Sequence, residues 1–181
     1  MEVEIKFELK GDTLEKIKGI AKFICRRSEA DTYFLSPVRD FKKTDEALRI
    51  RRENGFVRIT YKGPKVDNET KTREEIEVSV DSYENAVELL KRLGFKPFKE
   101  IRKVREVYKI GDITICVDDV EGLGRFIEFE KKSDDVDKAK KEIFELAGKL
   151  GYDISKSIRK SYLEMIIELE ELERSYDRFL S

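Results

Sequence analysis

Apolar and charged residues alternate along residues 2–9 of the chain. Apolar side chains occupy every second position from Val3 to Phe7, with charged side chains between them. A period of two residues is typical of a strand that buries only one of its faces. The same acid-x-acid alternation returns at residues 75–77 and 128–130, so we expect three strands of this kind.

Each of these strands precedes a segment with the periodicity of an amphipathic helix. Apolar residues lie three or four positions apart, Asp or Ser stands near each start, and Gly stands at the end of the second and third segments. The predicted helices run from Gly11-Asp12-Thr13 to about Arg26, from Asp81-Ser82 to Gly94, and from Asp134-Asp135 to the residue before Gly151. The strand and its helix therefore form a loose internal repeat that is too irregular for a solenoid.

Two hairpins are predicted between these units. Asn54-Gly55, flanked by alternating residues, is the strongest local signal for a tight turn. A two-residue turn there pairs Arg51 with Arg58, Arg49 with Thr60, and Ala47 with Lys62. The second turn, at Gly111-Asp112, pairs Arg105 with Asp118 and puts Lys103 on the same face. We expect loops at 36–46 and 63–72, and a final amphipathic helix over about 155–179.

The charged faces of these strands are segregated by sign. A solvated sheet face is the ordinary explanation for charged strand residues, but such a face normally mixes acids and bases, because like charges opposite one another are destabilising. The predicted helices need the apolar strand faces, so the charged faces turn toward each other. We therefore predict an α+β fold, with eight antiparallel strands closed into a barrel and helices packed outside. The acids are Glu2, Glu4, Glu75, Glu77, Asp118, Glu128 and Glu130, and the bases are Lys6, Arg49, Arg51, Arg58, Lys62, Arg73, Lys103 and Arg105.

Composition narrows the chemistry. The chain has 181 residues, which predicts a single domain over 1–181, and its net charge of −1 disfavours nucleic-acid binding. Histidine is missing and only Cys25 and Cys116 are present, so a metal would be held by carboxylates, which favours Mg²⁺ or Mn²⁺. The two cysteines form no paired motif, and neither a signal peptide nor a membrane-spanning run is recognisable, so we expect a cytoplasmic protein. Abundant Lys and Glu with no Gln resemble the composition of thermophile proteins.

An ordered set of motifs resembles the CYTH superfamily, the triphosphate tunnel enzymes, and within it the class IV adenylyl cyclase-like branch. The segment Glu2-Val3-Glu4-Ile5-Lys6 resembles the family's ExExK signature. This signature alone is weak evidence for the family, but the ordered set of further motifs makes the resemblance strong. The further matching residues are Asp31–Phe34, Pro37, Arg39–Phe41, Thr44–Arg51, Thr60–Pro64, Arg73, Glu75, Glu77, Lys103, Arg105, Asp118, Glu121–Gly124, Glu128, Glu130 and Lys160–Tyr162.

The resemblance implies roles for these residues. The implied metal ligands are Glu2, Glu4, Asp118, Glu128 and Glu130. The implied triphosphate-binding residues are Lys6, Arg49, Arg51, Lys62, Arg73, Lys103, Arg105 and Lys160. The implied catalytic residues are Glu4, Lys6, Arg105 and Glu130. Glu75 and Glu77 are either ligands or salt-bridge partners, Arg58 is placed at the rim, and Asp31 and Tyr33 are expected to brace the N-terminal strand.

Two reactions fit the charge pattern. The first is cyclisation of ATP to cyclic AMP and pyrophosphate, which the resemblance favours. The second is hydrolysis of an inorganic or organic triphosphate, including thiamine triphosphate. A module that binds nucleotide or polyphosphate without turnover is a non-catalytic alternative. The expected partner is thus a nucleoside or inorganic triphosphate, and the final helix can serve as a lid, a barrel cover or a homodimer surface.

Overall fold

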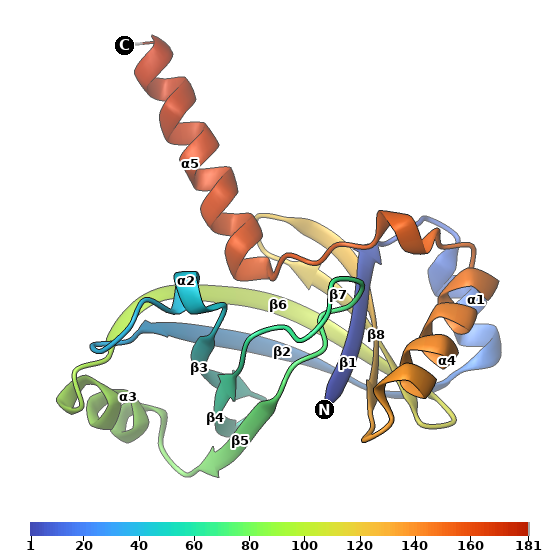
Figure 1. The fold of residues 1–181 in the computed structure, drawn as a ribbon, viewed down its shortest axis with the longest axis horizontal. Coiled ribbons are helices and arrows are strands. Elements are labelled where there is room, and N and C mark those ends of the chain that lie inside the picture. Colours follow the sequence, from blue (N-terminus) through green and yellow to red (C-terminus); the bar gives the residue numbers. More distant parts are fainter. Residues whose placement is uncertain (181) are drawn as a thin grey trace.

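The computed structural model describes residues 1–180 and contains one eight-stranded antiparallel sheet with helices around it (Figure 1). The strands follow each other across the sheet in the order β1-β8-β7-β6-β2-β3-β4-β5. None of the helices in this part of the chain is both long and apolar enough to cross a membrane. The elements are β1 (Glu2–Glu8), α1 (Thr13–Ile20), β2 (Lys22–Leu35), α2 (Phe41–Thr44), β3 (Ala47–Glu53), β4 (Phe56–Lys62), β5 (Glu75–Val80), α3 (Tyr83–Arg92), β6 (Lys96–Ile110), β7 (Ile113–Val120), β8 (Gly124–Lys132), α4 (Val136–Lys149), the 3₁₀ helix η1 (Ile154–Lys156) and α5 (Tyr162–Leu180).

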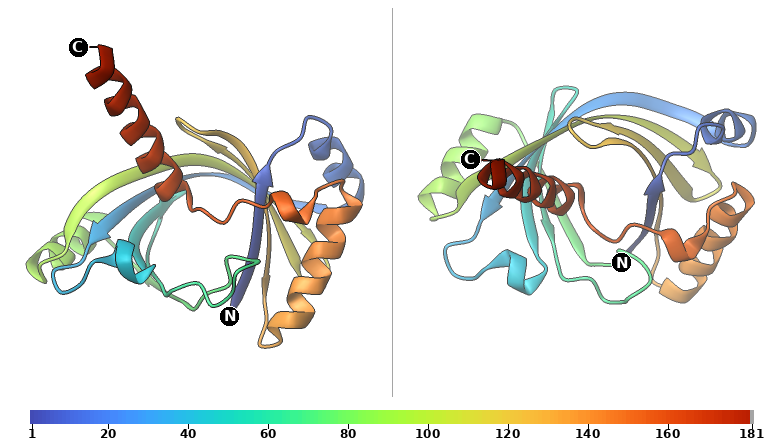
Figure 2. Two further views of the ribbon diagram at one scale, coloured as in Figure 1. Left: turned by 45° about the horizontal axis from the view of Figure 1, so that its top comes forward. Right: turned by 90° about the horizontal axis from the view of Figure 1, so that it is seen from above.

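The sheet curls strongly but ends at two edge strands, β1 and β5, so it is a half-barrel and the predicted closed barrel is not confirmed (Figure 2). The segment 63–74, which we call the strap, bridges the two edges. The backbones of Glu2 and Arg73 exchange two hydrogen bonds of 3.2 Å, and the Lys71 N–H donates to the Glu4 carbonyl at 2.9 Å. Asp67 accepts from backbone N–H groups ahead of it and forms a turn, which interrupts any continuous strand pairing here.

The helices α1, α3 and α4 cover the apolar outer face of the sheet, as expected. Residues of α1 and α4 pack with β1, β7 and β8 in one core cluster that includes Ile5, Phe129 and Ile143. The helix α3 packs over β3 in a second cluster around Ile50 and Leu90. Because side chains alternate along a strand, this packing turns the charged residues to the inside of the curl.

Both predicted hairpin registers are confirmed. Arg51 lies opposite Arg58 in the β3–β4 ladder, and Arg105 lies opposite Asp118 in the β6–β7 ladder. Asn54 and Gly55 have φ angles of 45° and 86°, the left-handed values that a tight two-residue hairpin turn requires.

Two predicted helix boundaries are wrong. The first helix ends at Ile20 rather than near Arg26, because residues from Lys22 onward pair with β6 and extend the sheet. The last helix begins at Tyr162 rather than near 155. The preceding segment runs beside β1, where the Ile158 N–H donates to the Lys6 carbonyl at 2.7 Å. The expected loop 36–46 also contains the short helix α2.

The true start of the last helix has a reciprocal cap. The Ser161 hydroxyl accepts from the Glu164 N–H at 3.1 Å, and the Glu164 carboxylate accepts from the Ser161 N–H at 2.6 Å. This is a capping box of the S-x-x-E type. The apolar periodicity of the last helix continues back to residue 158 and so does not reveal this boundary. The Ser-x-x-Glu capping box at residues 161–164 does mark it.

Candidate functional site

A cavity of about 600 Å³ lies inside the curled sheet and opens beside α2 and α5. Its wall carries charged side chains from β1, β3, β4, β5, β6 and β8, together with Lys71 from the strap. The residues predicted for the site that line it are Glu2, Glu4, Lys6, Arg49, Arg51, Lys62, Arg73, Lys103, Arg105, Glu128 and Glu130. The alternation of the strands therefore brings residues that are distant in the sequence to one chamber.

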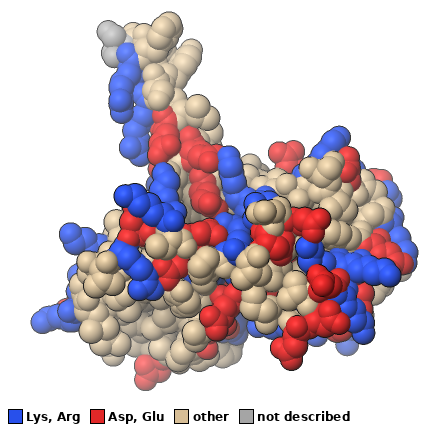
Figure 3. Space-filling model, viewed as in Figure 1, with Lys and Arg blue, Asp and Glu red and all other residues tan. Residues whose placement is uncertain are grey.

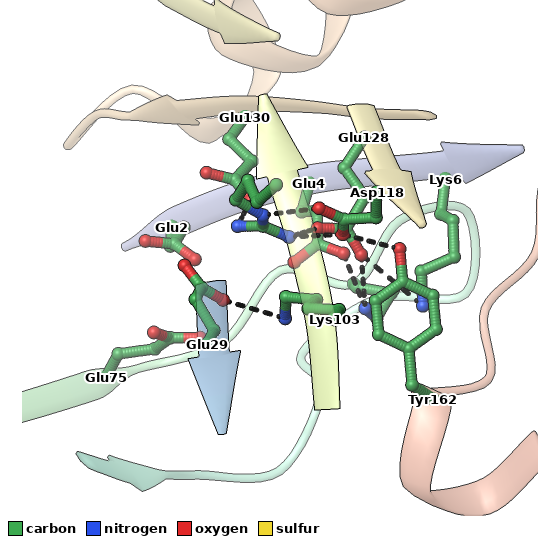
Figure 4. Close-up of polar contacts among 12 residues, drawn as sticks. Glu2, Glu4, Lys6, Glu29, Glu75, Lys103, Asp118, Glu128, Glu130 and Tyr162 are labelled. Carbon is green, nitrogen blue, oxygen red and sulfur yellow. Dashed lines mark hydrogen bonds and ion pairs between the residues drawn. The ribbon is translucent and has the colours of Figure 1, made fainter. Parts of the chain in front are cut away.

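Three carboxylates form a compact group, the carboxylate cluster, at one wall of this cavity (Figure 4). Glu4, Glu128 and Glu130 each offer an oxygen within 4.8 Å of the others. The β1–β8 ladder sets this arrangement, because Glu4 lies opposite Glu130 and Lys6 lies opposite Glu128. Two acid-x-acid strands paired in this register place their carboxylates side by side.

The pKa values of two acids in the cluster, Glu130 and Glu128, are shifted in opposite directions. Burial raises the pKa of Glu130 well above its usual value, and the neighbouring carboxylates Glu2, Glu128 and Glu4 add to the shift against the opposing effect of Arg105. Burial also acts to raise the pKa of Glu128, but the positive charges around it, Arg105 foremost, hold it well below its usual range. Burial and the neighbouring carboxylates therefore disfavour the charged form of Glu130 unless a further cation joins the cluster.

Three cationic side chains supply counter-charge to the cluster, and the first of them, the Lys6 ammonium, lies 3.5 Å from Glu128. The Lys71 ammonium contacts Glu4 and lies 3.9 Å from Glu128. The Arg105 guanidinium lies 2.6 Å from Glu128 and 3.5 Å from Glu130. Closely spaced carboxylate oxygens are ligands that Mg²⁺ and Mn²⁺ prefer, so the donor set of the cluster fits a hard divalent ion.

The other two predicted metal ligands lie apart from the cluster. Both oxygens of Asp118 face Arg105, and one also accepts from the Tyr162 hydroxyl at 2.7 Å. Asp118 is fully buried behind Arg105 and lies outside the cavity lining. Glu2 lines the cavity, and its pKa is raised by burial and by Glu75.

A basic group occupies another part of the wall, around Asp31. The Asp31 carboxylate accepts from the Arg51 Nε at 2.6 Å and from the Arg49 Nη1 at 3.2 Å. Glu29 lies 3.1 Å from the Lys103 ammonium (Figure 4) and 3.1 Å from Arg51. Asp31 thus orients the cations of β3, rather than bracing the N-terminal strand as expected.

The remaining predicted residues are paired nearer the rim or outside. Lys62 pairs with Glu75, and Arg58 lies 3.4 Å from Glu77, so both acids are salt-bridge partners of bases on β4. Arg73 lies 3.7 Å from Asp45. Lys160 lies outside the cavity lining, where its ammonium pairs with Glu168 at 2.6 Å, and its backbone carbonyl accepts from Lys6 Nζ at 2.9 Å.

Sequence reasoning missed three residues of the site. Lys71 lies in the strap, where no periodic pattern shows which way a side chain points. Glu29 falls beyond the end of the predicted first helix, in a segment without a recognised strand pattern. Tyr162 falls inside the predicted final amphipathic helix, whose periodicity assigns it no polar role. The structure instead packs its ring 3.9 Å from Lys6 Nζ and directs its hydroxyl to Asp118. A buried tyrosine with a polar handle at a helix start is the signal that could have identified it.

These features define a class of protein in which a curled antiparallel sheet, covered on its outside by helices, encloses a cavity. The cavity wall carries a carboxylate cluster and, around it, Arg and Lys side chains. The CYTH domain model matches residues 1–162, and the chain belongs to this family.

Two relatives carry adenylate cyclase names. A protein of Methanocaldococcus jannaschii named "putative adenylate cyclase" is 46% identical over 169 residues, covering 91% of this chain and 97% of the relative. The adenylate cyclase CyaB of Aeromonas hydrophila is 28% identical over 139 residues, covering 74% of this chain and 70% of that protein.

Solved structures share the fold. A protein of Pyrococcus horikoshii matches with a TM-score of 0.85 and 43% identity, covering 93% of this chain and 99% of that chain. A Hippeastrum protein, described as a "putative adenylyl cyclase" that has a dominant triphosphatase activity, matches with a TM-score of 0.63 and 19% identity. The alignment covers 83% of this chain and 88% of that chain, and it carries the fold alone.

Proposed function

We propose that this protein is a metal-dependent enzyme that converts ATP to cyclic AMP and pyrophosphate inside the cavity. The observation that carries the proposal is the meeting of Glu4, Glu128 and Glu130 within 4.8 Å, in a cavity that is also lined by twelve Arg and Lys residues. A triphosphate has the complementary charge to the bases, and a divalent ion has the complementary charge to the acids.

In this proposal the carboxylate cluster holds Mg²⁺ or Mn²⁺. When bound there, the ion neutralises phosphate charge and lowers the pKa of the ribose 3′-hydroxyl. Glu2 stands close enough to the other acids for their charges to couple, and would complete the acidic wall. Asp118 acts on the site through Arg105, whose guanidinium it fixes from behind.

The bases bind and align the triphosphate. Arg49, Arg51 and Lys103 are held by Asp31 and Glu29, so their positions are set before the ligand arrives. Preset cations lower the reorganisation needed to bind phosphate oxygens, and phosphoryl transfer depends mainly on such alignment and charge stabilisation. Lys6, Lys62, Arg73 and Arg105 are the other proposed binding residues.

The cyclase reaction is proposed over hydrolysis because the cavity continues beyond its charged part. Its lining next to α2 and α5 includes Phe41, Phe98, Leu163 and Ile167. Apolar and aromatic side chains next to phosphate-binding cations suit a ligand with an organic group, such as a nucleoside. With the ribose folded toward the α-phosphate, the 3′-oxygen forms a bond to that phosphorus, pyrophosphate leaves, and the hydroxyl proton passes to water.

Hydrolysis of an inorganic or organic triphosphate is the second candidate. The charged part of the cavity is the same for both reactions, and only the nucleophile and the ligand orientation differ. A protein of the same fold, from Hippeastrum, is described as having a dominant triphosphatase activity.

One assay tests the proposal. The protein is incubated with ATP, and separately with inorganic triphosphate, with Mg²⁺ or Mn²⁺ at temperatures suited to a thermophile's protein. We expect cyclic AMP and pyrophosphate from ATP, and no product after the metal is chelated. Orthophosphate without a cyclic product would assign the triphosphatase reaction instead, and binding without any product would overturn both enzymatic proposals.

A further inference from the structure

Residues 158–162 lead the chain into α5, and we call this segment the brace. It lies against β1, because the Ile158 N–H donates to the Lys6 carbonyl and the Lys160 carbonyl accepts from the Lys6 ammonium. It is also tied to the strap, since Arg159 Nη2 donates to a strap carbonyl at 2.7 Å. Figure 3 shows acidic and basic side chains crowded around the foot of α5, on the side of the molecule where the cavity opens. The brace therefore passes directly beside the proposed triphosphate site.

Tyr162, the last residue of the brace, is held at both ends of its side chain. Its backbone lies at the start of α5, next to the capping serine Ser161. Its hydroxyl donates to Asp118 at 2.7 Å, and its ring packs against the Phe126 ring with 5.2 Å between the centroids. Burial and nearby carboxylates raise the pKa of Tyr162 well above its ordinary value, so the hydroxyl remains a donor at neutral pH. The side chain is 7% exposed, and these contacts fix the plane of its ring.

Two lysines that line the cavity lie close to this ring (Figure 4). The Lys6 ammonium of β1 lies 3.9 Å from the ring centroid, and the Lys103 ammonium of β6 lies 5.2 Å from it. A cation near the face of a tyrosine ring is attracted by the ring quadrupole, most strongly where water is excluded. Both lysine side chains are at most 4% exposed. One ring therefore attracts two ammonium groups from strands that are not neighbours in the sheet.

Carboxylates compete with the ring for both ammonium groups. Lys6 Nζ lies 3.5 Å from Glu128, whereas a full charge-assisted hydrogen bond has a length of about 2.7–2.9 Å. The ring and the Lys160 carbonyl, 2.9 Å from Nζ, thus hold Lys6 away from full contact with Glu128. Lys103 Nζ lies 3.1 Å from Glu29. Without the ring, each ammonium would move closer to its carboxylate and become less available to a phosphate oxygen.

We propose that Tyr162 is a positioning residue whose ring keeps Lys6 and Lys103 oriented toward a bound triphosphate. This inference rests on the proposed function of the cavity. Tyr162 acts through the two lysines rather than on the phosphates, because the negative face of an aromatic ring repels anionic oxygens. Its hydroxyl sets the orientation of the ring through Asp118, the acid that also fixes Arg105. The start of α5 is in this way part of the triphosphate site.

Calorimetric binding of inorganic triphosphate, measured in EDTA and again with Mg²⁺, tests this role without requiring turnover. Tyr162→Leu removes the ring and should weaken triphosphate binding about 10-fold, a loss within the range of desolvated cation–π contacts. Tyr162→Phe keeps the ring and should stay within about threefold of the wild type. The matched control is Phe126→Leu, which removes a ring from the same core cluster but from outside the cavity lining. It should lower the urea midpoint as Tyr162→Leu does, and bind triphosphate as the wild type does.

A double-mutant cycle identifies the group through which the ring acts. Tyr162→Leu should weaken triphosphate binding less in a Lys6→Met background than in the wild type, because one of the two lysines that it positions is then missing. An equal loss in both backgrounds would overturn the proposal.

Two other results would also overturn it. Equal losses of affinity in Tyr162→Leu and Phe126→Leu would assign Tyr162 a packing role alone, and unchanged affinity in Tyr162→Leu would show that the ring does not position the lysines. A wild-type protein that binds no triphosphate under either condition would overturn the proposed function together with this inference, whereas the variant results overturn this inference alone.

Discussion

Arg105 and Asp118 face each other across the β6–β7 ladder and form a bidentate ion pair inside the protein. The Arg105 Nε lies 2.7 Å from one Asp118 oxygen, and Nη2 lies 2.6 Å from the other. The same Nη2 contacts Glu128 at 2.6 Å. One guanidinium therefore links a fully buried acid behind it to the carboxylate cluster in front, and its position depends on both.

We expect Asp118→Asn to destabilise the fold, because the substitution leaves the buried Arg105 without its bidentate partner. Breaking a buried ion pair on one side typically costs about 3–5 kcal/mol. Urea unfolding at neutral pH measures the loss. Asp119→Asn is the matched control, since Asp119 is exposed on the other face of the same strand and should change stability little. Equal stability of the two variants would contradict the structural role of Asp118.

Much of the site follows from the strand pattern and the hairpin turns. The Asn54-Gly55 turn fixes which residues of β3 and β4 share a face, and the Gly111-Asp112 turn does the same for Arg105 and Asp118. In a hairpin with a two-residue turn, counting outward from the turn gives the register directly. The convergence of the bases could therefore be predicted from sequence.

Some features of the site and of the helix boundaries depend on contacts between distant segments, and the local sequence pattern could not predict them. The direction of Lys71 depends on where the strap crosses between β1 and β5, and that path is set by Asp67 and by pairing with Glu2 and Glu4. The end of α1 depends on the pairing of β2 with β6, which overrides the helical periodicity of residues 21–26. Lys160 was placed in the site by family resemblance, whereas a turn before α5 directs its side chain to Glu168.

Glu130→Gln should remove metal-dependent turnover while the fold persists. The substitution keeps the size of the side chain and removes one carboxylate from a crowded cluster. Electrostatic repulsion with Glu4 and Glu128 decreases, so the fold is retained, whereas the affinity of the cluster for a divalent ion decreases because one ligand is lost. The assay is product formation at several Mn²⁺ concentrations, with urea unfolding in parallel. Glu8→Gln, at the exposed end of β1, is the control. Turnover equal to that of the wild type would remove Glu130 from the proposed metal ligands.

Lys71→Met should separate metal binding from triphosphate binding. The ammonium contacts Glu4 and stands near Glu128, so it competes with a divalent ion for the same oxygens. We expect the variant to bind Mn²⁺ alone more tightly, and to bind triphosphate with a KM raised about 10-fold through loss of one cation. Titration calorimetry with Mn²⁺ and steady-state kinetics measure the two effects.

The control for Lys71 is Lys65→Met, on the same strap, where the ammonium pairs with Asp45 instead of the cluster. Its Mn²⁺ affinity should equal that of the wild type. A Lys71→Met protein with unchanged Mn²⁺ affinity would show that the ammonium does not compete at the cluster.

Glu46 should make the stability of the protein sensitive to acid. Its carboxylate accepts hydrogen bonds from Arg39, Thr44 and Tyr61, which lower its pKa to about 2 from an ordinary value near 4.5. An acid with a depressed pKa in the folded state adds stability above the unfolded value, and this contribution is lost as the pH falls from about 4.5 toward 2. Urea midpoints of the wild type and of Glu46→Gln should therefore differ most at pH 6 and converge near pH 2. Glu121→Gln, an exposed acid in the turn after β7, should show no such pH-dependent difference, and a constant gap for Glu46→Gln across this range would contradict the linkage.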